Sequence, residues 1–146
     1  MSVRVRRLSR DESLLAAALH TQALRAAGTP PAPGFLDEYA RAWLASGDSV
    51  AQWVAEVGGQ HAGTITLSLP PMLPGVSAKR PNAEVLAIFA HENSPAVLLG
   101  MLRQVTADVR DLGYAGCQWP NVLKLPQEVL DASGALAHQP TLFRVN

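Results

Sequence analysis

The chain has 146 residues, of which 48% are hydrophobic and 16% charged, which is enough for one apolar core and too short for two full domains. Twelve basic residues balance twelve acidic ones, so the concentrated positive face of a nucleic-acid-binding protein is not expected. No apolar stretch approaches the roughly 20 residues of a membrane span, and the single cysteine cannot form an internal disulfide. We therefore predict one cytoplasmic domain over residues 1–146 with neither nucleic acid nor membrane as partner. The preference for arginine over lysine is typical of a GC-rich bacterium.

The first elements predicted are an edge strand and a helix. Alternating apolar residues over 3–8 indicate the strand. Ser9 and Glu12 have the spacing of a capping box, and apolar residues then recur at helical intervals at Leu14, Leu15, Ala18 and Leu19. A glycine at position 28 is expected to end this helix.

A second helix and a hairpin follow. Three prolines within 29–34 favour an extended connection, and the amphipathic pattern over 35–44 predicts a helix. Residues 50–57 and 61–69 read as two strands, and the glycines between them predict a tight turn.

The second half of the chain predicts a parallel pair of strands joined by a helix. A proline-rich loop fills 70–81, and Ser94 followed by Pro95 is typical of a helix start. The element order is β-α-α-β-β-β-α-β-α-β, which indicates an α/β (α+β) fold with a mixed, mainly antiparallel sheet flanked by about four helices. The later strands and helices are predicted at 82–90, 95–112, 114–119, 126–133 and 136–145.

The segments 56–64 (EVGGQHAGT), 83–90 (AEVLAIFA) and 112–114 (LGY) carry the most informative pattern in the chain. Together they resemble the GNAT (GCN5-related) N-acetyltransferases, in which a Gly-Gly or Asp-Gly turn leads to a strand opening with a small residue, glycine and threonine. The order of elements is similar over nearly the whole chain. The resemblance implies the GNAT fold, acetyl-CoA as cofactor, and a small-molecule or protein amine as acceptor.

The resemblance also implies which residues bind the cofactor. Main-chain groups of the fourth strand and an asparagine after the fifth would hold the pantetheine arm, and the start of the third helix would hold the pyrophosphate. The family's Arg/Gln-x-x-Gly-x-Gly/Ala loop is degenerate here, since 91–97 (HENSPAV) contains neither glycine nor arginine. We therefore expect acetyl-CoA binding to be weak or lost. The residues so implied are Ile88, Phe89, Ala90, Ser94, Ala96, Val97 and Asn121.

Glu84 is the candidate catalytic residue, because the family that the chain resembles often places a carboxylate near the start of its fourth strand, here the strand predicted at 82–90. Such a group can accept the proton of the attacking amine, directly or through water. The alternative is a solvent-facing glutamate at a strand end. Many family members also carry a tyrosine as general acid, but Leu130 stands at that position, and the nearest phenol in sequence is Tyr114.

Phe35, Tyr39 and Trp119 are the candidate substrate-binding residues. The first two lie on one stripe of the second helix, and the resemblance implies that this region helps to form the acceptor pocket; core packing of the stripe is the alternative. Trp119 follows a parallel strand end, where α/β sheets place ligands. No metal is expected, because the histidines, including His20, lack ligand spacing and are expected at the surface. Cys117 is expected to be a small core residue.

Two functions are consistent with these patterns. The first is an acetyl-CoA-dependent N-acetyltransferase acting on an unidentified primary amine. The alternative is a GNAT-like domain that has lost acetyl-CoA binding and serves as a binding or dimerisation module, with a homodimer as one form.

Overall fold

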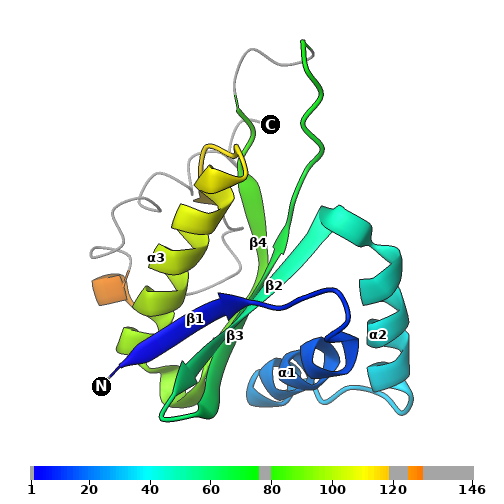
Figure 1. Cartoon of the computed structure of the whole chain (residues 1–146). Helices are drawn as coiled ribbons and strands as arrows, with labels where there is room; N and C mark the ends of the chain where they lie inside the picture. Colours follow the sequence, from blue (N-terminus) through cyan, green and yellow to red (C-terminus); the bar gives the residue numbers. More distant parts are fainter. Residues whose placement is uncertain (1, 76–79, 119–124, 130–146) are drawn as a thin grey trace.

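The computed structural model describes residues 2–75, 80–118 and 125–129. Within these ranges one five-stranded sheet has two helices on one face and a third helix on the other (Figure 1). No helix of the described ranges is long and apolar enough to cross a membrane. In chain order the elements are β1 (Val3–Arg7), α1 (Ser13–Ala26), α2 (Phe35–Ala45), η1 (Gly47–Ser49), β2 (Val50–Val57), β3 (Gln60–Ser68), β4 (Ala83–Ala90), η2 (His91–Asn93), α3 (Pro95–Asp111) and β5 (Cys117–Gln118).

The strands lie side by side in sequence order, and this arrangement confirms the predicted fold class. β1 to β4 pair antiparallel, whereas β5 runs parallel to β4. The β2–β3 turn is built on Gly58 and Gly59, whose φ angles are 58° and 79°. Both values fall in the left-handed region that a two-residue hairpin turn of this hand requires, so glycine suits both positions.

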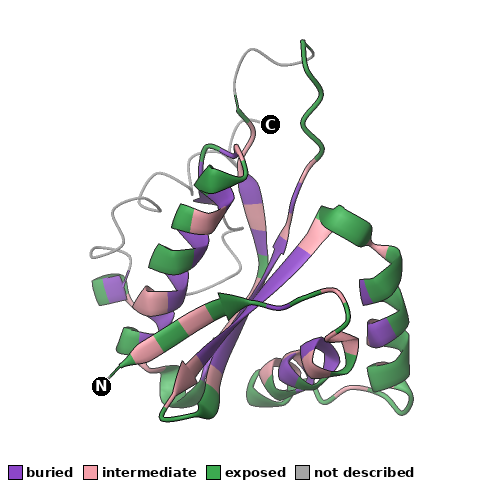
Figure 2. Ribbon diagram, in the orientation of Figure 1, coloured by how far each residue is buried: buried purple, intermediate pink, exposed green. Residues whose placement is uncertain are grey.

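The two faces of the sheet carry different cores. Along β2, Trp53 points toward α3, whereas Gln52 and Val54 point toward α1 and α2, as the alternation of a strand requires. Figure 2 shows the central strands mostly in purple, the colour of buried residues. The core on the α3 side is the larger and includes Val105 and Val109 of that helix, as the helical spacing of apolar residues over 97–109 in the sequence predicts.

Helix α1 begins later than predicted and buries a different face. The Ser9 N–H does donate to Glu12 Oε1, at 2.8 Å, but the Glu12 N–H donates back to the Ser9 carbonyl in a turn, and the helix starts at Ser13. Leu19 is buried as expected, but Leu14 is 66% exposed and Ala18 is exposed too, while Ala16 is buried in their place. Small alanines at this face let the helix approach the sheet closely, and this rotation could not be read from the leucine spacing.

Helices α2 and α3 lie where they were predicted, but two apolar positions of α2 are exposed and the last strand is shorter than expected. Leu36 and Leu44 of α2 are exposed, and its buried positions are Ala40 and Trp43. The predicted strand 114–119 is assigned only from Cys117, although the Ala115 N–H and the Gly116 carbonyl already hydrogen-bond to the segment 81–83. The predicted elements at 126–133 and 136–145 lie outside the described residues, apart from one helical turn at 127–129.

Candidate functional site

The beginning of strand β4 lies next to β5. Ala83 pairs with Cys117 and Glu84 with Gln118, and no further pairing with β5 occurs among the described residues. On its other side, β4 stays paired with β3 as far as Ala90. Beyond Glu84, β3 is therefore the one strand that pairs with β4 within the part of the chain that the structure describes.

A bulge interrupts the β3–β4 ladder just beyond Glu84, the last described residue of β4 that pairs with β5. Thr66 pairs with Ala87 and Leu67 with Val85, so Leu86 has no cross-strand partner. A bulge adds one residue to a strand and changes which side chains share a face. Consequently the consecutive residues Leu86 and Ala87 both line one pocket, whereas Val85 is buried in the core on the α3 side.

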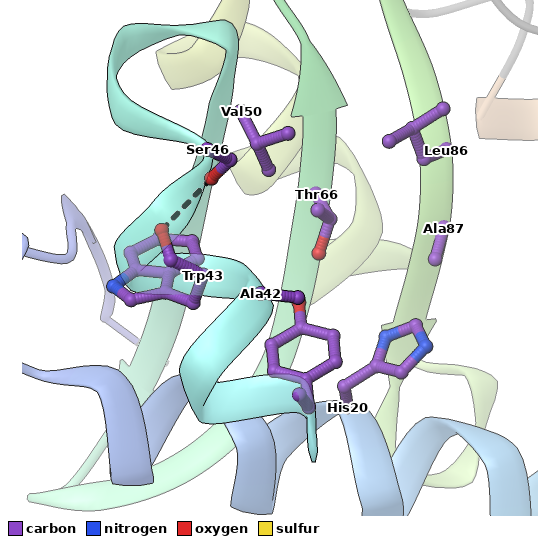
Figure 3. A pocket seen from close by; sticks show the side chains of 9 residues that line it. His20, Ala42, Trp43, Ser46, Val50, Thr66, Leu86 and Ala87 are labelled. Atoms are coloured by element: carbon purple, nitrogen blue, oxygen red, sulfur yellow. Dashed lines mark hydrogen bonds between the residues drawn. The ribbon is translucent and has the colours of Figure 1, made fainter. Parts of the chain in front are cut away.

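That pocket, here called the aromatic pocket, lies between β4 and the two helices α1 and α2 (Figure 3). Its volume is about 440 Å³, which suits a small organic molecule. It is lined by His20, Tyr39, Ala42, Trp43, Ser46, Val50, Thr66, Leu86 and Ala87.

A buried amide positions Tyr39 in this pocket. Gln52 is fully buried; its Nε2 donates to the Ala16 carbonyl at 3.2 Å and to Thr64 Oγ1 at 3.0 Å, and its Oε1 accepts from the Tyr39 hydroxyl at 2.8 Å. Both the amide nitrogen and the amide oxygen of Gln52 are thereby hydrogen-bonded, which stabilises a single orientation of this side chain. Burial raises the pKa of Tyr39, while the nearby Thr66 hydroxyl acts in the opposite direction.

Trp43 forms a rigid wall of the same pocket. Its indole N–H donates to the Arg10 carbonyl at 3.0 Å, and the Arg10 guanidinium lies 4.6 Å from the ring centroid. Ser46 Oγ donates to the Trp43 carbonyl at 2.8 Å (Figure 3). These contacts fix both the ring and the end of α2 that carries it.

His20 projects from α1 into the aromatic pocket and is not the surface residue expected from the sequence. Its ring stacks on Tyr39 at a centroid distance of 5.0 Å and on Phe35 at 6.0 Å. Burial lowers the pKa of His20 below its ordinary value of 6.5, so the imidazole is neutral at pH 7. Figure 3 shows the ring on the side of the pocket where Leu86 and Ala87 of β4 lie.

A second pocket, here called the loop pocket, lies at the far end of β4 and has a volume of about 450 Å³. It adjoins η2, where Glu92 and Asn93 adopt positive φ angles of 55° and 54°. β4 thus ends at Ala90, where the predicted strand 82–90 also ends, and His91 and Glu92 belong to the turn that follows. The lining consists of Ala23, Ala26, Ala27, Ile88, Phe89, Ala90, Glu92, Asn93, Leu98 and Leu125.

The predicted cofactor residues divide into two groups. Ile88, Phe89 and Ala90 line the loop pocket together. Ser94 caps α3 as predicted, since its Oγ accepts the Val97 N–H at 3.4 Å, so that donor is already engaged. Ser94, Ala96 and Val97 are absent from the described lining of either pocket, and Asn121 lies outside the described residues.

The other predicted site residues are also spread apart. Tyr39 lines the aromatic pocket, whereas Phe35 packs behind it, its ring 5.7 Å from that of Tyr39. Glu84 is half-buried beside Ser68 and Gln118 and lines neither pocket as described. Trp119 lies outside the described residues.

Sequence reasoning missed His20, Gln52 and Thr66. Gln52 and Thr66 leave a signal, because each is an uncharged polar residue inside an apolar strand, and a buried polar group needs a partner. His20 leaves none, since its role depends on how α1 rotates against α2. Elsewhere, Cys117 is a core residue as predicted, and burial raises the pKa of its thiol to about 12. Across the described ranges, no three His, Cys, Asp or Glu side chains gather where a metal ion could bind.

The sequence matches no family model and no curated protein, but solved structures share its fold. One is a predicted acetyltransferase from Clostridium acetobutylicum with acetyl-CoA, at 14% identity, covering 91% of this chain and 89% of that one with a TM-score of 0.65. A second is the aminoglycoside N-acetyltransferase AAC(6')-Iy with a bisubstrate analogue, at 16% identity, 92% and 90% coverage and a TM-score of 0.64. A third is the ribosomal-protein-alanine N-acetyltransferase from Brucella melitensis, at 16% identity, 90% and 88% coverage and a TM-score of 0.60. The chain therefore has the fold of the GNAT N-acetyltransferases, the family that its sequence resembles.

Proposed function

We propose that this protein is an acetyl-CoA-dependent N-acetyltransferase that transfers an acetyl group to a primary amine. One observation carries the proposal: the two pockets are lined by successive residues of one strand. Leu86 and Ala87 line the aromatic pocket, and Ile88 to Ala90 line the loop pocket. A cofactor in the loop pocket and an amine in the aromatic pocket would thus meet at the bulge of β4.

The residues of the loop pocket suit one end of acetyl-CoA better than the other. A pantetheine arm needs amide partners and apolar surroundings. The backbone of Ile88 to Ala90 would offer the first, and Leu98 and Leu125 would offer the second. A pyrophosphate needs positive charge or close backbone approach. The described lining contains no lysine or arginine, and Glu92 adds a carboxylate whose side chain is 84% exposed.

The chemistry divides between the cofactor and the chain. Acetyl-CoA, when bound, supplies an activated acyl thioester. Backbone N–H groups of β4 near the bulge would stabilise negative charge on an acyl oxygen, as preorganised donors do. Glu84 would accept the amine proton through water, because its carboxylate lies before the bulge and outside both pockets.

Calorimetric titration tests this function. We expect the protein to bind acetyl-CoA and S-acetylpantetheine with similar, modest affinity, because the arm provides most of the favourable contacts. Ala26→Trp on α1 fills the loop pocket and should abolish binding of both. Gln22→Trp is the matched control, since it places the same side chain on an exposed part of α1 outside both described linings. Equal binding by both variants would place the cofactor elsewhere.

The alternative is a GNAT-like module without acetyl-CoA, and Glu92 at the mouth of the loop pocket favours it. In that case neither ligand binds at millimolar concentration. The chain would then act as a binding or dimerisation module, and sedimentation over a range of concentrations would show whether it forms a homodimer.

A further inference from the structure

Two polar atoms in the aromatic pocket have no hydrogen-bonding partner among the described residues. They are Thr66 Oγ1, on a residue that is only 4% exposed, and His20 Nδ1. Buried polar groups are almost always satisfied in folded proteins, because an unpaired one costs about 1–3 kcal/mol. Two such atoms in one small pocket indicate that a ligand provides the missing partners.

The charges around the pocket narrow the ligand's chemistry. The described lining contains no Asp, Glu, Lys or Arg, and its titratable groups are His20 and Tyr39. The Tyr39 proton is already committed to Gln52, and Glu84 on β4 stands outside the lining. Burial alone shifts the pKa of His20, downward, which keeps the imidazole uncharged at neutral pH. The pocket therefore offers neutral acceptors and aromatic faces.

We propose that the aromatic pocket binds a primary monoamine with an apolar body, whose ammonium group donates hydrogen bonds to His20 Nδ1 and Thr66 Oγ1. The imidazole would be the Nε2–H tautomer, which leaves a lone pair on Nδ1. The faces of Tyr39 and Trp43 attract a cation and cover an apolar body.

This assignment rests on the proposed function insofar as the bound amine is the acetyl acceptor, but the binding itself needs no cofactor. A polycationic amine is disfavoured, because each further ammonium would enter a pocket whose described lining holds no carboxylate. A carboxylate ligand is disfavoured too, since no lysine or arginine of that lining would neutralise it.

Three ligands of one shape test the proposal: benzylamine, benzyl alcohol and benzoate, each titrated into the protein and followed by NMR of the histidine rings. We expect benzylamine to bind most tightly and to shift the His20 resonances. Its affinity should fall about ten-fold one pH unit below the pKa of His20, because a protonated imidazole repels the ammonium. Benzyl alcohol should show no such pH dependence. The proposal would be overturned if benzoate bound most tightly of the three. It would also be overturned if neamine, an amine with several ammonium groups, bound more tightly than benzylamine.

Two variants locate the contacts. Thr66→Val should weaken benzylamine binding about ten-fold and change the melting temperature little, because the hydroxyl that it removes lies near that of Tyr39, whose own hydrogen bond to Gln52 remains. His20→Phe keeps an aromatic ring against Phe35 and Tyr39 but should abolish both the binding and its pH dependence. His61→Gln, on the β2–β3 hairpin, is the matched control and should bind as the parent does. Unchanged binding by Thr66→Val and His20→Phe would overturn the proposal.

The outcomes separate this inference from the proposed function. Benzylamine binding without any acetyl-CoA binding would support the amine pocket and contradict the proposed acetyltransferase function. Acetyl-CoA binding with benzylamine excluded at all pH values would support the cofactor site and overturn the amine pocket.

Discussion

Gly63 in β3 lies against the carbonyl of Phe89 in β4, so closely that a β-carbon on Gly63 would stand 2.6 Å from that oxygen. It would also lie 3.0 Å from Val97 Cγ1 and 3.1 Å from Met101 Cε. The glycine of the 56–64 segment is thus required by contact between strands rather than by a positive φ. It lets β4 and the start of α3 approach β3 at the candidate cofactor pocket.

Gly63→Ala should therefore destabilise the protein by about 1–3 kcal/mol, as overpacking does, because backbone rather than a flexible side chain must move. Denaturant titration measures the loss. Gly100→Ala in α3 is the control: its β-carbon would meet two side-chain atoms of Val3, the nearer at 3.2 Å, and alanine favours a helix. Equal stabilities for the two variants would contradict the tight contact at Gly63.

Val105→Asp tests the buried face of α3. Val105 is completely buried between α3 and the sheet, so a carboxylate there is desolvated without a partner and should cost several kcal/mol. Ala107→Asp makes the same charge change at an exposed position of α3 and should cost well under half as much. Thermal melting of both variants distinguishes burial from a general effect of charge.

Glu12→Gln tests an ion pair that joins the end of β1 to the start of α1. Arg6 donates to both carboxylate oxygens, at 3.0 and 3.1 Å, and together with the Ser9 N–H it lowers the pKa of Glu12 to about 2. A carboxyl whose pKa is lowered by folding stabilises the protein above its unfolded pKa of about 4.5. This stabilisation should disappear as the pH falls from about 4.5 to about 2.

The expected size is at most about 1 kcal/mol, because the Arg6 side chain is 43% exposed and solvent screens the pair. Unfolding free energies measured from pH 7 to pH 2 should show parent and Glu12→Gln converging at low pH. Asp111→Asn, an exposed acid at the end of α3, is the control. A constant difference between parent and Glu12→Gln at all pH values would rule out the ion pair as its source.

Glu92→Arg tests whether residue 92, at the loop pocket, lies beside the phosphates of bound acetyl-CoA. Replacing a carboxylate by a guanidinium beside bound phosphates should strengthen acetyl-CoA binding by about 1 kcal/mol, roughly five-fold, and added salt should reduce the gain. Binding of S-acetylpantetheine, which lacks the pyrophosphate, should not change. Glu38→Arg on the exposed side of α2 is the control. If Glu92→Arg improves both ligands equally, the gain does not come from the phosphates.

The order of the elements could be predicted because each strand and helix carries its own periodicity. The apolar stripe of α3 and the glycine pair between β2 and β3 act locally, and the structure places both as expected. The face that α1 buries could not be predicted, since leucine spacing favoured Leu14 whereas close packing of Ala16 decides the rotation.

The site was harder to predict because it depends on contacts between distant segments. The bulge at Leu86 follows from pairing with β3, and the position of His20 follows from the packing of α1 against α2. Resemblance to a family supplied Ile88, Phe89, Ala90 and Tyr39 as candidates because those positions follow from the order of elements. Gln52 and Thr66 left only the signal of polar residues inside apolar strands, and His20 left none.

The unequal cores on the two faces of the sheet bear on how the molecule opens. Helices α1 and α2 are held by a small apolar cluster around Leu19, Trp43 and Val54, whereas α3 shares the larger core. Local unfolding is easiest where the least apolar surface must be exposed. The amide hydrogens of α1 and α2 should thus exchange with solvent before those of α3. The aromatic pocket is built on α1 and α2 and so belongs to the part that unfolds locally more often. A ligand held there would slow exchange in α1 and α2 while leaving α3 almost unaffected.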